Sequence, residues 1–203
     1  MNKAATAVMS VLLLTTTTLV PYKIKENVIK TNRPDIIYPL LEEFAEESRL
    51  DNPILFLAQN LQEIKIVSSD NKELNSKKQG ALYSDSDEIL GRVIYEKKPS
   101  GFSKFYVYEL RILLNKNLLE SDYATRHVLF HEIGHLFGLK HNNIKKQEDD
   151  VLHIMNANFP LWYAKQYPQI KKHWNKHSAA FFRKVKASNR NRWLRRFNLY
   201  CCK

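Results

Sequence analysis

Five residues between positions 131 and 141 have the types and the spacing of a metal site. They follow the pattern H-E-x-x-H-x-x-G-x-x-H and are His131, Glu132, His135, Gly138 and His141. Side chains four residues apart lie on one face of a helix, so the first two histidines can direct their imidazoles at a single ion. Glu132 is next to the first histidine and can reach a water molecule on that ion. The first half of the pattern therefore predicts two metal ligands with a carboxylate beside them.

The second half of the pattern supplies a bend and a third ligand. A helix that ends in a left-handed turn needs a residue without a Cβ atom at that position, and Gly138 meets this need. The chain can then double back so that His141 brings a third imidazole to the ion. Three nitrogen ligands and a water molecule form a catalytic zinc site with an open position. We therefore predict one catalytic Zn²⁺ held by His131, His135 and His141.

The alternative interpretation is an amphipathic helix that carries histidines on its surface. The complete pattern arises by chance on the order of 10⁻⁵ times per chain, which favours the zinc site. His127 lies four residues before His131, one turn too early to share an ion with His135. We expect His127 to be a bystander, partly buried or at the surface. The remaining histidines, His153, His173 and His177, have no comparable spacing.

Through "HEIGHLFGLKH" the sequence resembles the metzincins, a superfamily of zinc endopeptidases, and within it the matrixins and their small bacterial relatives. The resemblance implies that the three histidines are zinc ligands and that Glu132 is the general base. It also implies a methionine on a tight turn below the metal, and "DVLHIMNANF" supplies Met155. The implied reaction is hydrolysis of peptide bonds in a polypeptide substrate by a zinc-activated water.

The resemblance covers residues 34–186 and also implies where a substrate binds. Residues 106–115 stand where the family has an edge strand that pairs with an extended peptide. Two features depart from the matrixin pattern: Asn142 replaces the usual serine after the third histidine, and the interval from His141 to Met155 is longer. Ala157 stands where astacins have a tyrosine ligand, which disfavours a ligand of that type. The superfamily is therefore indicated, but its subfamily is not.

The elements around the histidines predict an α+β fold. Apolar residues at helical spacing predict a helix over residues 34–50, and a second helix that starts at Ser121 or Asp122 carries the histidines. Strands are predicted over residues 61–67, 91–98 and 104–115, the last two antiparallel across a turn at 99–101, with a surface loop over 70–88. The resemblance implies a twisted, mostly parallel sheet with an antiparallel edge strand, packed by the first helix and the active-site helix, and a small C-terminal subdomain with a helix.

The predicted surface loop contains three acidic residues, Asp85, Asp87 and Glu88. Carboxylates of this kind can hold a hard cation such as Ca²⁺. A solvated loop is the favoured interpretation, and a Ca²⁺ site is the alternative.

The N-terminal 20 residues have the character of an export signal. Lys3 precedes an uncharged run over residues 4–20, which Pro21 ends. This predicts a cleaved signal peptide, with an uncleaved membrane anchor or an ordinary N-terminal helix as alternatives. We accordingly divide the chain into a signal or anchor (1–20), a linker (21–33), a metzincin-like catalytic domain (34–187) and a tail (188–203). The expected location is secreted, periplasmic or in the cell envelope, or anchored in a membrane.

The net charge of +11 resides in the C-terminal quarter of the chain. All 21 acidic residues lie in residues 1–150, while residues 151–203 hold 12 of the 32 Lys and Arg residues and no acid. The tail 188–203 combines this charge with Trp193 and Phe197. Three interpretations stay open: a solvated extension, contact with an anionic membrane, or contact with nucleic acid or another polyanion. The adjacent Cys201 and Cys202 could be acylated, which would favour the membrane.

Taken together, these features predict a monomeric zinc-dependent endopeptidase. Two other functions stay open at this point. One is a zinc-binding protein whose basic tail is the functional part, and the other is a zinc hydrolase of a non-peptide amide. Glu132 disfavours the first of these, because a structural zinc site needs no base.

Overall fold

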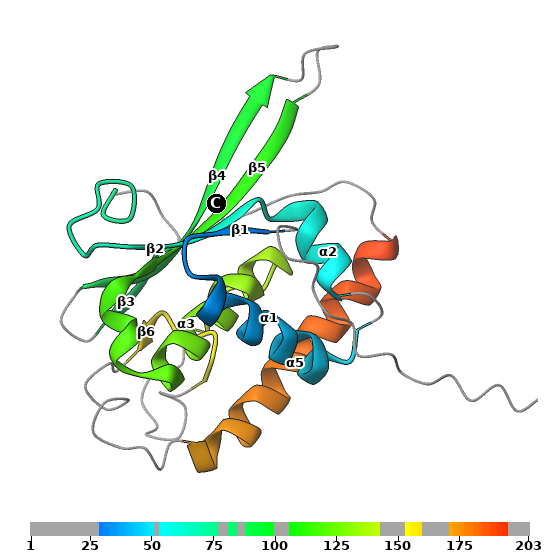
Figure 1. Cartoon of the computed structure of the whole chain (residues 1–203). Helices are drawn as coiled ribbons and strands as arrows, with labels where there is room; N and C mark the ends of the chain where they lie inside the picture. The colour runs from blue at the N-terminus through cyan, green and yellow to red at the C-terminus, as the bar shows by residue number, and fades with distance from the viewer. Residues whose placement is uncertain are drawn as a thin grey trace, which may run out of the picture.

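The computed structural model describes residues 29–50, 53–76, 81–84, 88–99, 106–142, 153–159 and 171–194. Its elements are, in chain order, β1 (Lys30–Thr31), α1 (Pro34–Ser48), α2 (Pro53–Asn60), β2 (Glu63–Val67), β3 (Ala81–Ser84), β4 (Ile89–Pro99), β5 (Tyr106–Asn115), the 3₁₀ helix η1 (Lys116–Glu120), α3 (Asp122–Leu136), β6 (Asn158–Phe159) and α5 (Lys171–Leu194). Together they form a mixed fold in which helices pack against a sheet (Figure 1). The predicted signal or anchor, Asp85, Asp87 and residues 195–203 of the tail lie outside the described residues.

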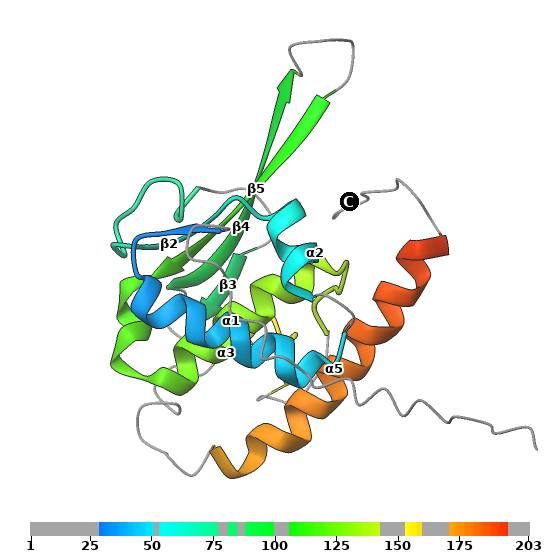
Figure 2. The same ribbon diagram turned by 45° about the vertical axis from the view of Figure 1, so that its right-hand side comes forward.

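The sheet has the strand order β1-β2-β5-β4-β3-β6. β1, β2 and β5 are parallel, β4 is antiparallel to both of its neighbours, and β3 is parallel to β6. The prediction of a mostly parallel sheet is therefore confirmed, but the predicted antiparallel edge strand is not, because the antiparallel strand β4 lies between β5 and β3. β4 and β5 extend beyond the other strands as a two-stranded arm, which both ribbon views show (Figures 1 and 2).

The prediction that residues 106–115 form an edge strand is wrong for residues 111–115. These residues of β5 are paired with β2 on one side and with β4 on the other, whereas residues 106–110 are in register with β4 alone among the described strands. The physical reason lies in the side chains of residues 111–115. Ile112 and Leu114 are buried in the main core, whereas Leu113 is buried in a second cluster with Val67 and Leu74. A strand that is apolar and buried on both faces belongs inside a sheet, not at its edge.

Several short elements, among them β3 and α2, were not predicted from the sequence. The expected surface loop over 70–88 contains the strand β3, and the helix α2 begins at Pro53. Proline is favoured in the first turn of a helix because the N–H it lacks would be unpaired there anyway. Each element is at most eight residues long, which is too short for the repeat of apolar residues to identify it.

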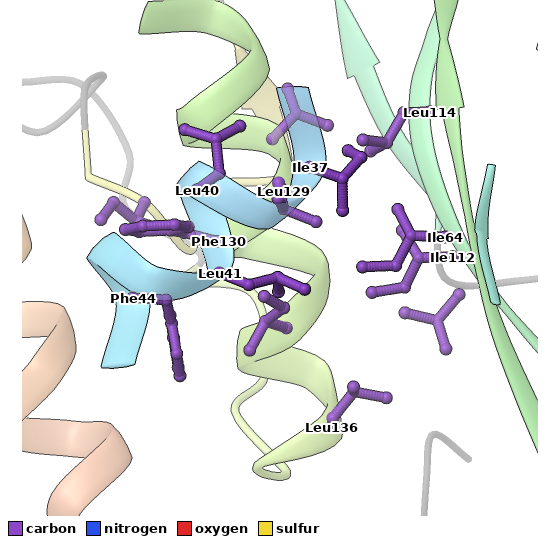
Figure 3. Packing of buried hydrophobic residues seen from close by; sticks show 14 of the residues in the cluster. Ile37, Leu40, Leu41, Phe44, Ile64, Ile112, Leu114, Leu129, Phe130 and Leu136 are labelled. Carbon is purple, nitrogen blue, oxygen red and sulfur yellow. The ribbon is translucent and has the colours of Figure 1, made fainter. Parts of the chain in front are cut away.

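The helix α1 packs on α3 and on the sheet through one face. Its buried apolar residues follow a helical repeat and are Ile37, Leu40, Leu41 and Phe44. Figure 3 shows Ile64 and Ile112 of the sheet directed toward these helices. The ring of Phe44 lies 5.3 Å from that of Phe130 and 5.4 Å from that of Phe182, so α1, α3 and α5 meet at this residue. α1 is therefore a core helix with one solvated face.

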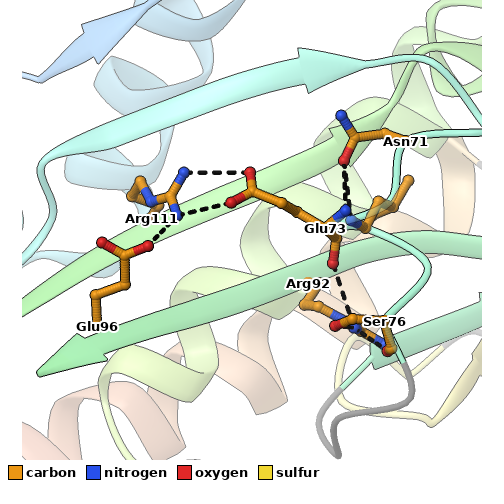
Figure 4. Close-up of polar contacts among 7 residues, drawn as sticks. Asn71, Glu73, Ser76, Arg92, Glu96 and Arg111 are labelled. Atoms are coloured by element: carbon orange, nitrogen blue, oxygen red, sulfur yellow. Dashed lines mark hydrogen bonds and ion pairs between the residues drawn. The ribbon is translucent and has the colours of Figure 1, made fainter.

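Polar contacts attach the segment around Glu73 and Ser76 to the opposite face of the sheet (Figure 4). Arg92 of β4 is buried and donates to the backbone oxygens of Ser76 and Glu73 and to the Ser76 hydroxyl. Arg111 of β5 forms ion pairs with Glu73, at 3.1 Å, and with Glu96, at 2.6 Å. These contacts hold the backbone of β4 from the face away from α3.

The helix α5 contributes to the same core as the rest of the described chain. It buries Trp174, Phe181, Phe182 and Val185. The indole nitrogen of Trp174 donates to Glu47 of α1 at 3.0 Å. α5 is continuous across positions 187 and 188, where we had placed the boundary between catalytic domain and tail. Within the described ranges, no helix is long and apolar enough to cross a membrane.

Candidate metal centre

The helix α3 carries the first two histidines of the pattern through the centre of the protein. Ser121 caps its N-terminus, where the hydroxyl oxygen accepts from the backbone N–H of Ala124 at 3.3 Å. Every residue from His127 to Leu136 is buried. The helix is thus enclosed on all sides, and this rigid setting limits the rotamers that its ligand side chains can adopt.

Gly138 ends α3 and reverses the chain. Its φ is 76°, in the left-handed region that residues with a Cβ atom rarely adopt. The backbone N–H of Gly138 donates to the oxygen of His135 at 2.9 Å, and that of Leu139 donates to the oxygen of Gly134 at 3.0 Å. This pair of bonds is a Schellman motif, which satisfies the last carbonyls of the helix. It directs the following residues back along the helix and brings His141 to the other two histidines.

The three predicted ligands converge on one point. The distances between their Nε2 atoms are 3.0 Å from His131 to His141, 3.1 Å from His135 to His141 and 3.2 Å from His131 to His135. A tetrahedral Zn²⁺ with bonds of about 2.0–2.1 Å separates its ligand nitrogens by roughly 3.3 Å. The triangle is therefore of the size that such an ion requires, and the three histidines form a site that could hold a metal ion.

The hydrogen bonds of Nδ1 show which ring nitrogen carries the hydrogen in His131 and His135. The Nδ1–H of His131 donates to the backbone oxygen of Ile154 at 2.5 Å, and the Nδ1–H of His135 donates to that of Leu139 at 2.8 Å. Both Nε2 atoms consequently carry a lone pair that faces the other rings. The Nε2 atoms of His131 and His135 lie 3.2 Å apart, and two lone pairs at this distance repel one another unless a cation or a proton lies between them. The donor set therefore fits a metal ion, and the two carbonyls provide the outer hydrogen bonds that orient metal-binding imidazoles.

Burial keeps the imidazoles in the neutral form that binds metals. It lowers the pKa of His131 well below its usual value, and the neighbouring His135 and His141 lower it further. Burial also lowers the pKa of His135, to about 4, and that of the less enclosed His141. At neutral pH protons therefore compete weakly for these nitrogens.

Glu132 is fully buried between α3 and β4. Among the residues that the structure describes, neither carboxylate oxygen has a hydrogen-bond partner of normal geometry. Burial raises the pKa of this carboxyl well above its usual value, while the charge of Arg92 and the backbone of Val93 lower it. A buried acid costs stability, so its position beside three histidines that could hold a metal ion makes Glu132 a candidate for a chemical role.

Met155 lies in a tight turn against the helix. The turn covers residues 153–156 and is closed by a bond of 2.9 Å from the N–H of Asn156 to the oxygen of His153. Met155 is fully buried, and a Cβ atom at Gly134 would come within 2.6 Å of its sulfur. The preceding residue, Ile154, provides the carbonyl that holds His131. This turn therefore supports the metal site by packing and by one hydrogen bond.

The other histidines take different places. His127 is buried, contrary to the expected partly buried or surface position, and its ring lies 4.3 Å from that of Phe159. His153, to which the spacing assigned no role, contacts Asn142 beside the third ligand. His173 and His177 lie on α5, but their side chains are outside the described part of the structure. No local repeat in the sequence marks His153, since its partner is reached only through the fold.

The acidic residues considered for Ca²⁺ are described only in part. Glu88 accepts from the side-chain amides of Asn115, at 2.9 Å, and Asn117, at 2.7 Å. These bonds join the start of β4 to the end of β5. The Ca²⁺ site stays a prediction, because Asp85 and Asp87 lie outside the described residues.

Comparisons with protein-family models, with curated proteins and with solved structures find no match to this chain. The metal centre consequently rests on its own geometry. That geometry comprises three converging neutral imidazoles, two of them held by carbonyls, with a buried carboxylate next to the first ligand in the chain. Such an arrangement can bind a dication and exchange a proton with a molecule beside it.

Proposed function

We propose that this protein is a zinc-dependent endopeptidase of the metzincin type. The observation that carries the proposal is the combination of the three-histidine cluster with the buried, unpartnered carboxylate of Glu132. A structural zinc site is closed by four protein ligands and has no use for a base. Three ligands and an adjacent acid are instead the composition of a hydrolytic site. The order of residues in H-E-x-x-H-x-x-G-x-x-H supports the metzincin assignment, as does Met155 beneath the helix.

In the proposed hydrolysis Glu132, Arg92 and two backbone carbonyls have separate roles. A bound Zn²⁺ supplies Lewis acidity, which polarises a carbonyl group and lowers the pKa of a water molecule. Glu132 accepts a proton at a carboxylate oxygen from the attacking water and delivers it to the nitrogen of the leaving amine. Burial raises the pKa of Glu132, and the charge of Arg92 opposes this shift in favour of the ionised carboxylate that accepts this proton. The carbonyls of Ile154 and Leu139 keep the imidazoles oriented throughout.

The decisive experiment compares Glu132→Ala with the unchanged chain. The zinc content of the purified protein is measured together with cleavage of an unfolded polypeptide, with and without a chelator. We expect one zinc ion per chain in both proteins and loss of cleavage, by a factor of at least about 100, in the variant. Glu46→Ala is the matched control, because Glu46 is an exposed glutamate on α1.

Three outcomes would reject the peptidase. One is chelator-sensitive cleavage by Glu132→Ala at the rate of the unchanged chain. Another is a zinc-loaded protein that cleaves small amides but no polypeptide, which would assign the site to a hydrolase of non-peptide amides. A zinc-loaded chain that cleaves neither substrate would favour the binding protein whose basic tail acts.

A further inference from the structure

The third histidine is held differently from the other two. His131 and His135 each donate from Nδ1 to a backbone carbonyl, and both rings are buried. His141 is only partly buried and follows the helix on a short connection. Among the described residues, its hydrogen-bonding contacts are those of Nε2 with His131 and His135, at 3.0 and 3.1 Å. The placement of this ligand therefore depends on the segment that carries it.

The neighbouring residue, Asn142, makes the contacts that hold this segment. Its backbone N–H donates to the oxygen of Met155 at 2.8 Å. Its side-chain amide lies 2.8 Å from Nδ1 of His153, which also accepts from the N–H of Met155 at 3.2 Å. Its side-chain oxygen accepts from Nζ of Lys184 at 3.2 Å. Asn142 thus connects the ligand segment to the methionine turn and to α5.

We propose that Asn142 is a positioning residue for the third metal ligand. The peptide group that joins residues 141 and 142 is fixed by the bond to Met155, and this fixes the Cα atom of His141. The side-chain bonds then prevent rotation of that peptide. Metal binding demands ligand atoms within about 0.2 Å of their proper distances, so a small rotation in this peptide is enough to weaken the site.

The bonds of Asn142 differ in strength. The contact with His153 is partly buried, whereas the contact with Lys184 is exposed. Water competes more effectively for the exposed bond, which therefore contributes less.

α5 also supports the site at two further points, since Phe181 packs at Gly134 and the Ser188 hydroxyl donates to the oxygen of Phe137. The helix α5 therefore supports the metal centre.

The test measures metal binding by the full chain and does not depend on catalysis. Zn²⁺ affinity is determined by competition with a chromophoric chelator, and the absorption spectrum of bound Co²⁺ reports the coordination geometry. Loss of outer contacts at metal sites weakens binding by roughly 10–100-fold, so we expect Asn142→Ala to bind Zn²⁺ at least about 10-fold more weakly and to alter the Co²⁺ spectrum. Lys184→Met should weaken binding by about 2-fold, because its bond is exposed.

Three further variants separate positioning from general effects. Lys186→Met removes an exposed lysine from the same helix and should leave both measurements unchanged. In the Asn142→Ala background, Lys184→Met should have no further effect, because the two residues act through one bond. Asn142→Asp keeps the oxygen that accepts from Lys184 and should fall between Asn142→Ala and the unchanged chain.

The proposal is overturned if Asn142→Ala binds Zn²⁺ and Co²⁺ like Lys186→Met. Should Asn142→Ala fail to fold, Asn142→Asp and Lys184→Met decide by the same measurements, and unchanged binding by both would reject the proposal. The inference rests on the metal centre alone. Failure of the peptidase experiment would leave it standing, and failure here would leave the peptidase standing.

Discussion

Gly91 of β4 lies directly against Glu132 of α3. A Cβ atom at position 91 would come within 2.8 Å of Oε1 of Glu132 and within 2.6 Å of Cγ1 of Val128. The strand backbone therefore forms one wall of the space that holds the carboxylate. Arg92 anchors the same strand from the opposite face of the sheet, so this wall cannot move back easily.

Gly91→Ala should impair hydrolysis much more than zinc binding. The added methyl group must displace either Val128, which is packed in the core, or the end of Glu132, which is the more mobile of the two. We expect a loss of stability of about 1–3 kcal/mol from overpacking and a fall in kcat, with the zinc content unchanged. Peptide cleavage, zinc content and urea unfolding measure these effects. An unchanged kcat in a folded variant would show that the close contact does not position the carboxylate.

Removal of the metal should destabilise the protein reversibly. A ligand that binds only the folded chain stabilises it by about 2.7 kcal/mol at 100 times its Kd. For a chain of this size that corresponds to a rise in Tm of roughly 5–10 °C. Thermal unfolding with a chelator, with added Zn²⁺, and with Zn²⁺ added to His131→Ala would measure the change. An equal response of His131→Ala would mean that the metal binds elsewhere.

The metal-free protein should lose stability as the pH falls from neutral toward 4. The folded state lowers the pKa of His135 from 6.5 to about 4. Between these values the unfolded chain binds a proton that the folded chain does not, so the free energy of unfolding decreases as pH falls. One such group contributes a slope of about 1.4 kcal/mol per pH unit. Above pH 6.5 the imidazole of His135 is neutral in both states, so the protein loses no stability through this group there.

Urea unfolding at a series of pH values would measure this slope. Carboxylates also titrate below pH 5, so His135→Gln is the necessary comparison. That variant should show a shallower decline between pH 6.5 and 5. Identical slopes for the two proteins would mean that His135 is protonated in the folded state at its ordinary pKa.

The effect of Gly134→Ala on the free energy of unfolding should depend on the residue at position 155. A Cβ atom at 134 would lie 2.6 Å from the sulfur of Met155 and 2.9 Å from a ring carbon of Phe181. The substitution gains about 1 kcal/mol in helix propensity but costs about 1–3 kcal/mol in overpacking, so the net effect is a loss. In a Met155→Ala background most of the clash is removed, and the same substitution should be neutral or stabilising. Free energies of unfolding for the two single variants and the double variant test this, and simple additivity would contradict it.

The metal ligands could be predicted because their relation is local. His131 and His135 are one helical turn apart. Gly138 reverses the chain so that His141, six residues after His135, can meet them. A helical repeat and a left-handed glycine act over a few residues, and their effect is the same in any fold that keeps the helix. The sequence by itself therefore determined that these three histidines come together as a cluster that could hold a metal ion.

The surroundings of those ligands depend on contacts between distant residues. Gly91 meets Glu132, and Asn142 meets Lys184, only after the sheet and α5 have packed. Residues 111–115 of β5 were misplaced at an edge because local apolar content does not say which strands will flank them. Burial of His127, the support of His141 and the enclosure of the carboxylate were decided by tertiary structure alone. The physical reason is that side-chain packing, unlike helical spacing, has no period along the chain.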